Sequence, residues 1–166
     1  MSVHLRPVTD DDLPGIGELH YRSRATAYAD LLTPEALTFG SPAGLGEFWS
    51  ERWKWERETH RLTVAIAEGS LAGFTYLGPS SEDGAGELYA IHAAPEFVGR
   101  GVGRALMVDA LAALPAYGPT ATLWVLDGNA RARTFYERGG WIADGTTRVE
   151  PIGGEPVLQV RYSRAL

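Results

Sequence analysis

The sequence predicts an α/β protein in which helices pack on a mixed β-sheet. Three observations carry this prediction. An apolar strand runs into a glycine-rich turn and an amphipathic helix, a second strand leads into a capped helix, and two short apolar strands are joined by a tight turn. Segments that alternate in this way form layers around one core. The chain has 166 residues and 45% apolar content, so we expect a single domain spanning residues 1–166.

The N-terminal half predicts one strand, helices and a hairpin. A strand at 3–8 precedes a helix that Thr9 caps and that ends before Leu31. A short helix restarts at 32–35, and a longer one covers 47–58 after a Gly- and Pro-containing break at 40–46. A hairpin follows, with strands at 61–67 and 71–77, and a loop is expected after it at 78–86.

Three alternate glycines, Gly99, Gly101 and Gly103, lie between a predicted strand at 86–95 and a predicted helix at 103–115. Glycine has no Cβ to keep a ligand from the backbone, and the first turn of a helix offers free N–H groups and a positive dipole end. The pattern therefore suits a pyrophosphate, with a plain glycine turn as the alternative. The spacing matches neither the dinucleotide fingerprint nor the P-loop.

A second strand-to-helix unit follows. Residues 120–126 are typical of a strand, Asn129 of a helix N-cap, and 130–138 of a short helix that ends at two glycines. Further strands are expected at about 141–149 and 156–164. The order of these units, with the glycine loop and the capped helix, resembles the GNAT superfamily of acyl-coenzyme A-dependent N-acetyltransferases.

This resemblance implies a GNAT acyltransferase fold, a mixed sheet of about seven strands that is splayed between the fourth and fifth strands and flanked by helices. It also implies that acetyl-CoA, the acyl donor, lies in the splay, with its pyrophosphate on the loop amides and its pantetheine arm along the fourth strand. The family usually has Gln or Arg where this chain has Val98, so a polar side-chain contact is lost. The implied cofactor-binding residues are Ile91, His92, Ala93, Val98, Gly99, Arg100, Gly101, Val102, Gly103, Arg104 and Asn129.

Glu87 is the candidate general base. An alkyl ammonium has a pKa near 10, so about one amine in a thousand is free at pH 7, and a base offsets roughly 4 kcal/mol of deprotonation work. The resemblance places a glutamate base of one family branch at Glu87, whereas the base position of another branch is Trp124 here. A solvated strand-entry glutamate is the alternative. His92 is a weaker candidate because regular alternation puts it on the opposite face from Glu87, unless a bulge intervenes.

Tyr136 is the candidate general acid. It lies seven residues after Asn129, where the resemblance implies the tyrosine that protonates the departing thiolate. Its phenol has an ordinary pKa near 10, close to that of a thiol, so proton transfer is feasible. Packing beside Phe135 is the alternative role.

Composition excludes several classes of function. There is no cysteine, so a disulfide scaffold, a Cys-ligated zinc site and an acyl-cysteine intermediate are excluded, and the histidines show no metal-ligand spacing. A net charge of −6 with one lysine, Lys54, argues against a protein that binds nucleic acid. The negative charge favours a cationic amine as substrate only weakly, because salt screens long-range electrostatic fields. No signal or membrane segment is evident, so we expect a cytoplasmic protein; a homodimer is left open.

An aromatic stripe in the helix expected at 47–58 has two interpretations. Phe48, Trp49, Trp53 and Trp55 either pack in the core, which their helical spacing favours, or line an acceptor pocket. The sequence thus predicts an N-acetyltransferase that transfers acetyl from acetyl-CoA directly to a primary amine of a small molecule, without a metal. The alternatives are a protein or peptide amine as acceptor, or a non-catalytic acyl-CoA-binding module.

Overall fold

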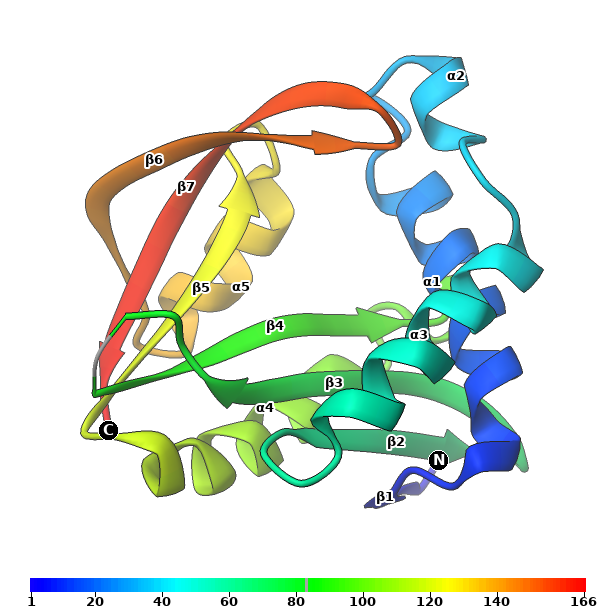
Figure 1. Ribbon diagram of the computed structural model, residues 1–166, viewed down its shortest axis with the longest axis horizontal. Coiled ribbons are helices and arrows are strands. Elements are labelled where there is room, and N and C mark those ends of the chain that lie inside the picture. The colour runs from blue at the N-terminus through cyan, green and yellow to red at the C-terminus, as the bar shows by residue number, and fades with distance from the viewer. Residues whose placement is uncertain (83) are drawn as a thin grey trace.

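The computed structural model describes residues 1–82 and 84–166. Seven strands form one sheet in the order β1-β2-β3-β4-β5-β7-β6 (Figure 1). The strands are β1 Val3–Pro7, β2 Arg61–Ala67, β3 Ser70–Pro79, β4 Ala85–Ala93, β5 Thr120–Leu126, β6 Ile142–Ile152 and β7 Glu155–Ala165. The helices are α1 Leu13–Ala27, α2 Pro34–Leu37, α3 Pro42–Glu56, α4 Val102–Ala113 and α5 Ala130–Arg138, with 3-10 turns at Asp10–Asp12, Pro95–Phe97 and Leu114–Tyr117.

The sheet is mixed and splayed in the middle, which confirms the predicted fold class. All neighbouring strands are antiparallel except β4 and β5, which are parallel because α4 carries the chain back across the sheet. The register between them runs only from Ala85–Thr120 to Glu87–Thr122, and among the described residues it goes no further. Beyond Glu87 the two strands separate (Figure 1).

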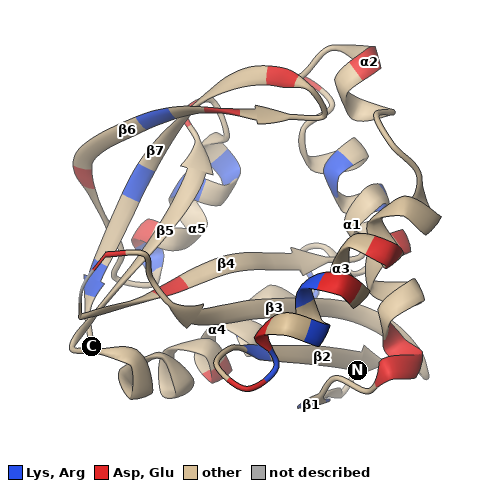
Figure 2. Cartoon of the chain, viewed as in Figure 1, with Lys and Arg blue, Asp and Glu red and all other residues tan. Residues whose placement is uncertain are grey.

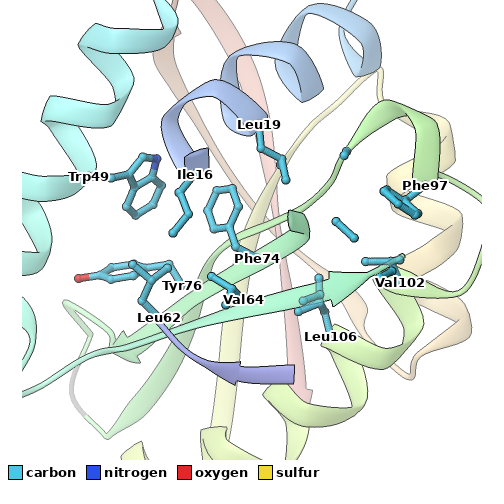
Figure 3. Close-up of a cluster of buried hydrophobic side chains, with 14 of the residues drawn as sticks. Ile16, Leu19, Trp49, Leu62, Val64, Phe74, Tyr76, Phe97, Val102 and Leu106 are labelled. Atoms are coloured by element: carbon cyan, nitrogen blue, oxygen red, sulfur yellow. The ribbon is translucent and has the colours of Figure 1, made fainter. Parts of the chain in front are cut away.

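Helices cover both faces of the sheet. On one face, Trp49 of α3 packs against Phe74 and Tyr76 of β3, with ring centroids 5.4 and 5.2 Å apart. Ile16 and Leu19 of α1 join this cluster (Figure 3). On the other face, α4 and α5 contribute Leu106 and Tyr136 to the core. Burial of these apolar side chains supplies the main driving force for folding.

Helix α3 begins five residues earlier than predicted, so the expected break at 40–46 is wrong. Ser41 caps the helix by accepting a hydrogen bond from the Gly44 N–H at 2.9 Å, and Pro42 occupies the first helical position. Gly46 lies against Gly17 of α1, where a Cβ on Gly17 would be 2.1 Å from the Gly46 nitrogen. Gly46, which indicated a break between helices in the sequence, therefore lies where α1 and α3 cross at close distance.

The loop expected at 78–86 is shorter than predicted, since β3 continues to Pro79 and β4 begins at Ala85. Residue 83 of that loop lies outside the described residues. Strand β5 and helix α5 have the predicted bounds. In the part of the chain that the structure describes, no helix is long and apolar enough to span a bilayer.

Candidate functional site

The glycine loop adopts a conformation that requires glycine at two positions. Gly99 and Gly101 have φ values of +78° and +91°, in the left-handed region that disfavours side chains. Gly101 is the N-cap of α4. Gly103 lies within the helix, and a Cβ there would meet Phe135 at an ordinary 3.7 Å. Backbone geometry therefore explains two of the three glycines and leaves the third unexplained.

The loop presents free backbone N–H groups at the start of α4. The amides of Val98 and Arg100 donate to the carbonyls of Pro95 and Phe97, at 3.3 and 3.2 Å. Among residues 1–82 and 84–166, no acceptor bonds the N–H groups of Gly99, Gly101, Val102, Gly103 or Arg104. Five amides beside the positive end of a helix dipole form a site suited to an anion.

The side chains around this loop differ in their exposure and in their contacts. Arg100 pairs with Glu68 at 2.6 Å and lies over the Phe97 ring, while Val98 is 40% exposed and Arg104 faces outward on α4. Arg131 of α5, which the sequence analysis did not single out, brings its guanidinium to 3.9 Å from the Cβ position of Gly99. The sequence offered one signal for this arginine: it follows the predicted helix cap, Asn129, by two residues.

Asn129 is the N-cap of α5, as predicted. Its Oδ1 accepts a hydrogen bond from the Ala132 N–H at 3.2 Å. This contact satisfies one of the free N–H groups at the start of α5, the turn that also carries Arg131.

A β-bulge in β4 puts Glu87 and His92 on the same face. Ala90 lies opposite Tyr76 and Leu88 opposite Leu77, so Tyr89 is the extra residue and the alternation shifts by one. Glu87 then lies opposite Gly78 and His92 opposite Phe74, on the face that α1 and α3 cover. The expectation of opposite faces is therefore wrong. The cause is a bulge, the exception named in the sequence analysis, and no glycine or proline marks it in the sequence.

Glu87 is a buried carboxyl group at the point where β4 and β5 separate. It is 9% exposed, and its Oε1 accepts a hydrogen bond from the Ser80 hydroxyl at 3.2 Å. Burial raises the pKa of Glu87 above its ordinary value, although Ser80, Arg148 and Arg52 oppose the shift. A carboxyl in this setting is not a solvated strand-entry residue, which was the alternative interpretation.

His92 lies further along β4 on the same face, where it packs among other rings. Its Nδ1 is 2.9 Å from the Ser23 hydroxyl, and its ring lies 4.7 Å from His20 and 5.4 Å from Phe74. Burial holds the pKa of His92 well below its ordinary value. Burial, with the nearby charge of Arg24, lowers the pKa of His20 to about 4. Both rings are therefore neutral at pH 7.

Tyr136 is buried on α5, at 9% exposed, between Phe135 and Tyr162. Burial raises its pKa well above the ordinary value, and proximity to Tyr28 adds to the shift. None of the described residues hydrogen-bonds its hydroxyl group. The phenol therefore keeps its proton at neutral pH and has a free donor, while it also packs in the core.

Glu87 and His92 line a cleft of about 520 Å³ between the sheet and the N-terminal helices. The cleft carries three arginines, Arg24, Arg52 and Arg148, against one carboxylate, Glu87. Its positive lining contrasts with the net charge of −6 for the whole chain, so overall charge is a poor guide to the acceptor. In the described part of the chain, no three His, Asp or Glu side chains are grouped to hold a metal ion.

The aromatic stripe divides between the core, the cleft and the surface. Trp49 is 2% exposed and forms part of both the core and the cleft wall, and Phe48 lines the cleft. Trp53 packs at the edge of the core. Trp55 is 74% exposed and donates a hydrogen bond to Glu51, so neither interpretation holds for it.

Comparison with known proteins places this geometry in a family. Residues 27–141 match the model of the acetyltransferase (GNAT) family. The mycothiol acetyltransferase of Acidimicrobium ferrooxidans is 39% identical over 85 residues, which are 49% of this chain and 27% of that protein. A protein of Mycobacterium tuberculosis named "probable N-acetyltransferase" is 26% identical over 97% of this chain and 92% of its own length. The chain thus spans about a quarter of the first of these relatives.

Solved structures share the fold along the whole chain. The PaiA N-acetyltransferase of Thermoplasma acidophilum, solved in complex with coenzyme A, superposes with a TM-score of 0.80 at 19% identity and covers 100% of both chains. A spermidine N-acetyltransferase, a chimera of SpeG from Vibrio cholerae and hSSAT, superposes with a TM-score of 0.73 at 22% identity, covering 99% of this chain and 96% of that one. The family match covers more than half of the sequence and the fold agrees throughout: this chain belongs to the acetyltransferase (GNAT) family.

Proposed function

We propose that this protein is an N-acetyltransferase that transfers acetyl from acetyl-CoA directly to a primary amine of a small molecule, and that residues 1–166 form one domain. The observation that carries the proposal is the position of Glu87. This buried carboxyl lies where β4 and β5 separate and lines a cleft on the face of the sheet opposite α4. An acceptor amine entering the cleft and an acyl donor lying in the splay would meet beside it.

The donor side rests on the loop amides and on the open edge of β4. The five free N–H groups at the start of α4 suit the pyrophosphate of acetyl-CoA, and Arg131 and Arg104 add positive charge nearby. Residues 91–93 lie beyond the last β4–β5 pair, so their backbone groups on that side can bond the pantetheine arm as an added strand would.

In the proposed reaction, Glu87 accepts a proton from the ammonium of the acceptor, directly or through a water. The free amine attacks the thioester carbonyl and the C–N bond forms. As the tetrahedral intermediate collapses, its nitrogen releases the second proton to water and the C–S bond breaks. Tyr136 donates its proton to the departing thiolate and regains one from water. His92 is a poor base here because burial keeps its pKa low and Ser23 occupies its Nδ1. Its proposed part is limited to its backbone and to shaping the cleft.

The volume of the cleft favours a small-molecule acceptor. A cleft of about 520 Å³ lies within the roughly 300–1,000 Å³ range of small-ligand sites. A protein amine and a non-catalytic acyl-CoA-binding module remain rival proposals. Thiol release from acetyl-CoA with small amines and with peptides, followed by mass spectrometry of the products, separates the three: binding of acetyl-CoA without thiol release supports the module.

Tyr136→Phe is expected to lower kcat for acetyl transfer by about 10- to 100-fold, since only the proton donor is removed. The ring packing remains, so we expect the melting temperature to change by less than about 2 °C. Steady-state thiol release and calorimetric melting test this together. Phe135→Leu is the control, because it disturbs the same packing and leaves the hydroxyl in place. An unchanged kcat for Tyr136→Phe would rule out its role as the acid.

Gly101→Ala is expected to weaken acetyl-CoA binding by about tenfold or more, because a side chain at φ +91° costs roughly 1–2 kcal/mol and shifts the loop amides. Gly103→Ala is the matched control for folding: a Cβ there meets only an ordinary contact, and helix propensity rises. Isothermal titration with coenzyme A and thermal melting measure both variants. Equal affinity in Gly101→Ala and the wild type would contradict the proposed anion site.

A further inference from the structure

We infer that the acceptor is an amine that also carries an oxyanion, such as a carboxylate or a phosphonate, and that Arg24 and Arg148 bind this group. The inference rests on the proposed function and names the substrate class of the same cleft. It depends on which of the cleft's positive charges already have a partner.

Arg24 is a buried guanidinium on the cleft wall. It lies in the last turn of α1 and is only 7% exposed. One terminal nitrogen donates to the Phe39 carbonyl, but Nε is buried without a hydrogen-bond partner among the described residues. No described carboxylate lies within 4 Å of it. A buried charge without a counter-ion is costly, and an anion in the cleft would compensate it.

Arg148 faces the cleft from the opposite side, on β6. Its Nε donates to Gln159 Oε1 at 2.9 Å, and its guanidinium lies 4.2 Å from the centre of the Trp124 ring. These two contacts fix the side chain and leave its terminal nitrogens without an ion pair in the described part of the chain. Glu150, next but one along β6, and Glu87 act on Arg148 only at longer range. In Figure 2 basic segments of α1, at the right, and of β6, at the upper left, lie above β4, which carries an acidic segment.

Arg52, the third arginine of the cleft, is already neutralised. Its Nε donates to Glu56 Oε1 at 2.5 Å, and the same oxygen accepts from the Tyr76 hydroxyl at 2.6 Å. The neutral rings of His20 and His92 add no charge. The cleft therefore offers one carboxylate, Glu87, to an amine. To an oxyanion it offers the guanidinium groups of Arg24 and Arg148, which form no ion pair within 4 Å among the described residues. A simple amine or a polyamine would meet repulsion from the guanidinium groups.

The test compares amines that share one body. One set is L-phenylalanine, its phosphonate analogue, phenylalaninamide and phenethylamine; a second is 5-aminopentanoate and pentylamine, in which the anion is remote. In at least one set, we expect the wild-type protein to acetylate an anionic member with a kcat/KM about tenfold or more higher than that of its neutral partner. This is the effect of one charge-assisted hydrogen bond. The sets also tell a carboxylate from a phosphonate, and a near anion from a remote one.

Arg24→Gln and Arg148→Gln are each expected to remove most of that advantage. The KM for acetyl-CoA should stay within about twofold. The advantage is taken as the ratio of kcat/KM between anionic and neutral amines within each variant, because loss of Arg148 also raises the pKa of Glu87 and acts on both kinds of amine alike. Arg138→Gln, on the exposed end of α5, is the control and should keep the advantage. Arg148 lies on an exposed strand, so its variant tests the inference even where Arg24→Gln fails to fold.

Two readouts separate this inference from the proposed function. Turnover with equal rates for anionic and neutral amines, or an advantage that survives both substitutions, overturns the inference and leaves acetyl transfer standing. Calorimetric titration of the same compounds supplies the second readout. Binding of the anionic amines that both substitutions weaken, without any thiol release, would support the inference and overturn the proposed reaction.

Discussion

Glu87→Gln lowers kcat/KM for amine acetylation by about 10²- to 10³-fold, the expected loss when a general base is removed and binding is kept. Glutamine has nearly the same shape and can still bond the Ser80 hydroxyl, so the cleft is preserved. Steady-state thiol release measures the loss. Glu18→Gln, which removes an exposed carboxylate of α1, is the control and should match the wild type. Wild-type turnover in Glu87→Gln would remove Glu87 from the mechanism.

The pH profile gives the same variant a second readout. A general base must be ionised, so the rate falls as pH drops through the pKa of Glu87. Burial raises that pKa, which places the acid limb above the ordinary range of a glutamate, about 4.3. We expect Glu87→Gln to lose this limb and to keep the rise at high pH that comes from the amine. An acid limb that persists unchanged in Glu87→Gln would assign it to another group.

The substitution Glu87→Gln is expected to raise the stability of the fold, although it lowers activity. Because the folded-state pKa of Glu87 lies above the unfolded value, the folded protein binds its proton more tightly, and stability falls as pH rises from the unfolded pKa through the folded one. The penalty is complete at pH values above the folded-state pKa. Glu87→Gln removes it, so at those pH values we expect a higher melting temperature than in the wild type. A fall in melting temperature would point to a structural role for the carboxylate.

Gly17→Ala is the second substitution with a large expected effect, on folding. A Cβ at this position would lie 2.1 Å from the Gly46 nitrogen and 2.5 Å from its Cα, which are backbone atoms of α3 that cannot rotate away. The two helices must separate, and the cost is expected at the upper end of overpacking, about 3 kcal/mol or more. Urea denaturation measures the loss. The acceptor cleft should be lost as well, since α1 and α3 carry Arg24, Phe48 and Arg52.

Gly15→Ala on the same helix is the matched control. Its Cβ would meet only the end of the Leu71 side chain, at 3.2 Å, which a small rotation relieves. Alanine also has the higher helix propensity, by roughly 1 kcal/mol. We therefore expect Gly15→Ala to be neutral or slightly stabilising. Equal losses from the two substitutions would mean that the contact between α1 and α3 does not explain the Gly17 result.

Elements governed by local chemistry could be predicted from the sequence. Strand β5 and helix α5 have the expected bounds, because β-branched and apolar residues, an Asn cap and a terminal glycine pair act within a few residues of one another. The glycine loop followed from the same reasoning, and the positive φ values of Gly99 and Gly101 agree with it. The start of α3 was missed because Gly44 and Gly46 suggested a break, whereas the Ser41 cap and the contact with Gly17 keep the helix intact.

By itself, then, the sequence determined the order of strands and helices, the fold class and the glycine loop, since each depends on residue types at short spacing. The resemblance to the family added the candidates Glu87 and Tyr136, whose roles stay predictions. Tertiary structure alone decided which face Glu87 and His92 share, through the bulge at Tyr89, and which charges line the cleft. It also brought Arg131 to the loop and set Arg24 across from Arg148. The physical reason is that pairing register, burial and ion pairing depend on residues far apart in the chain, which only the folded packing brings together.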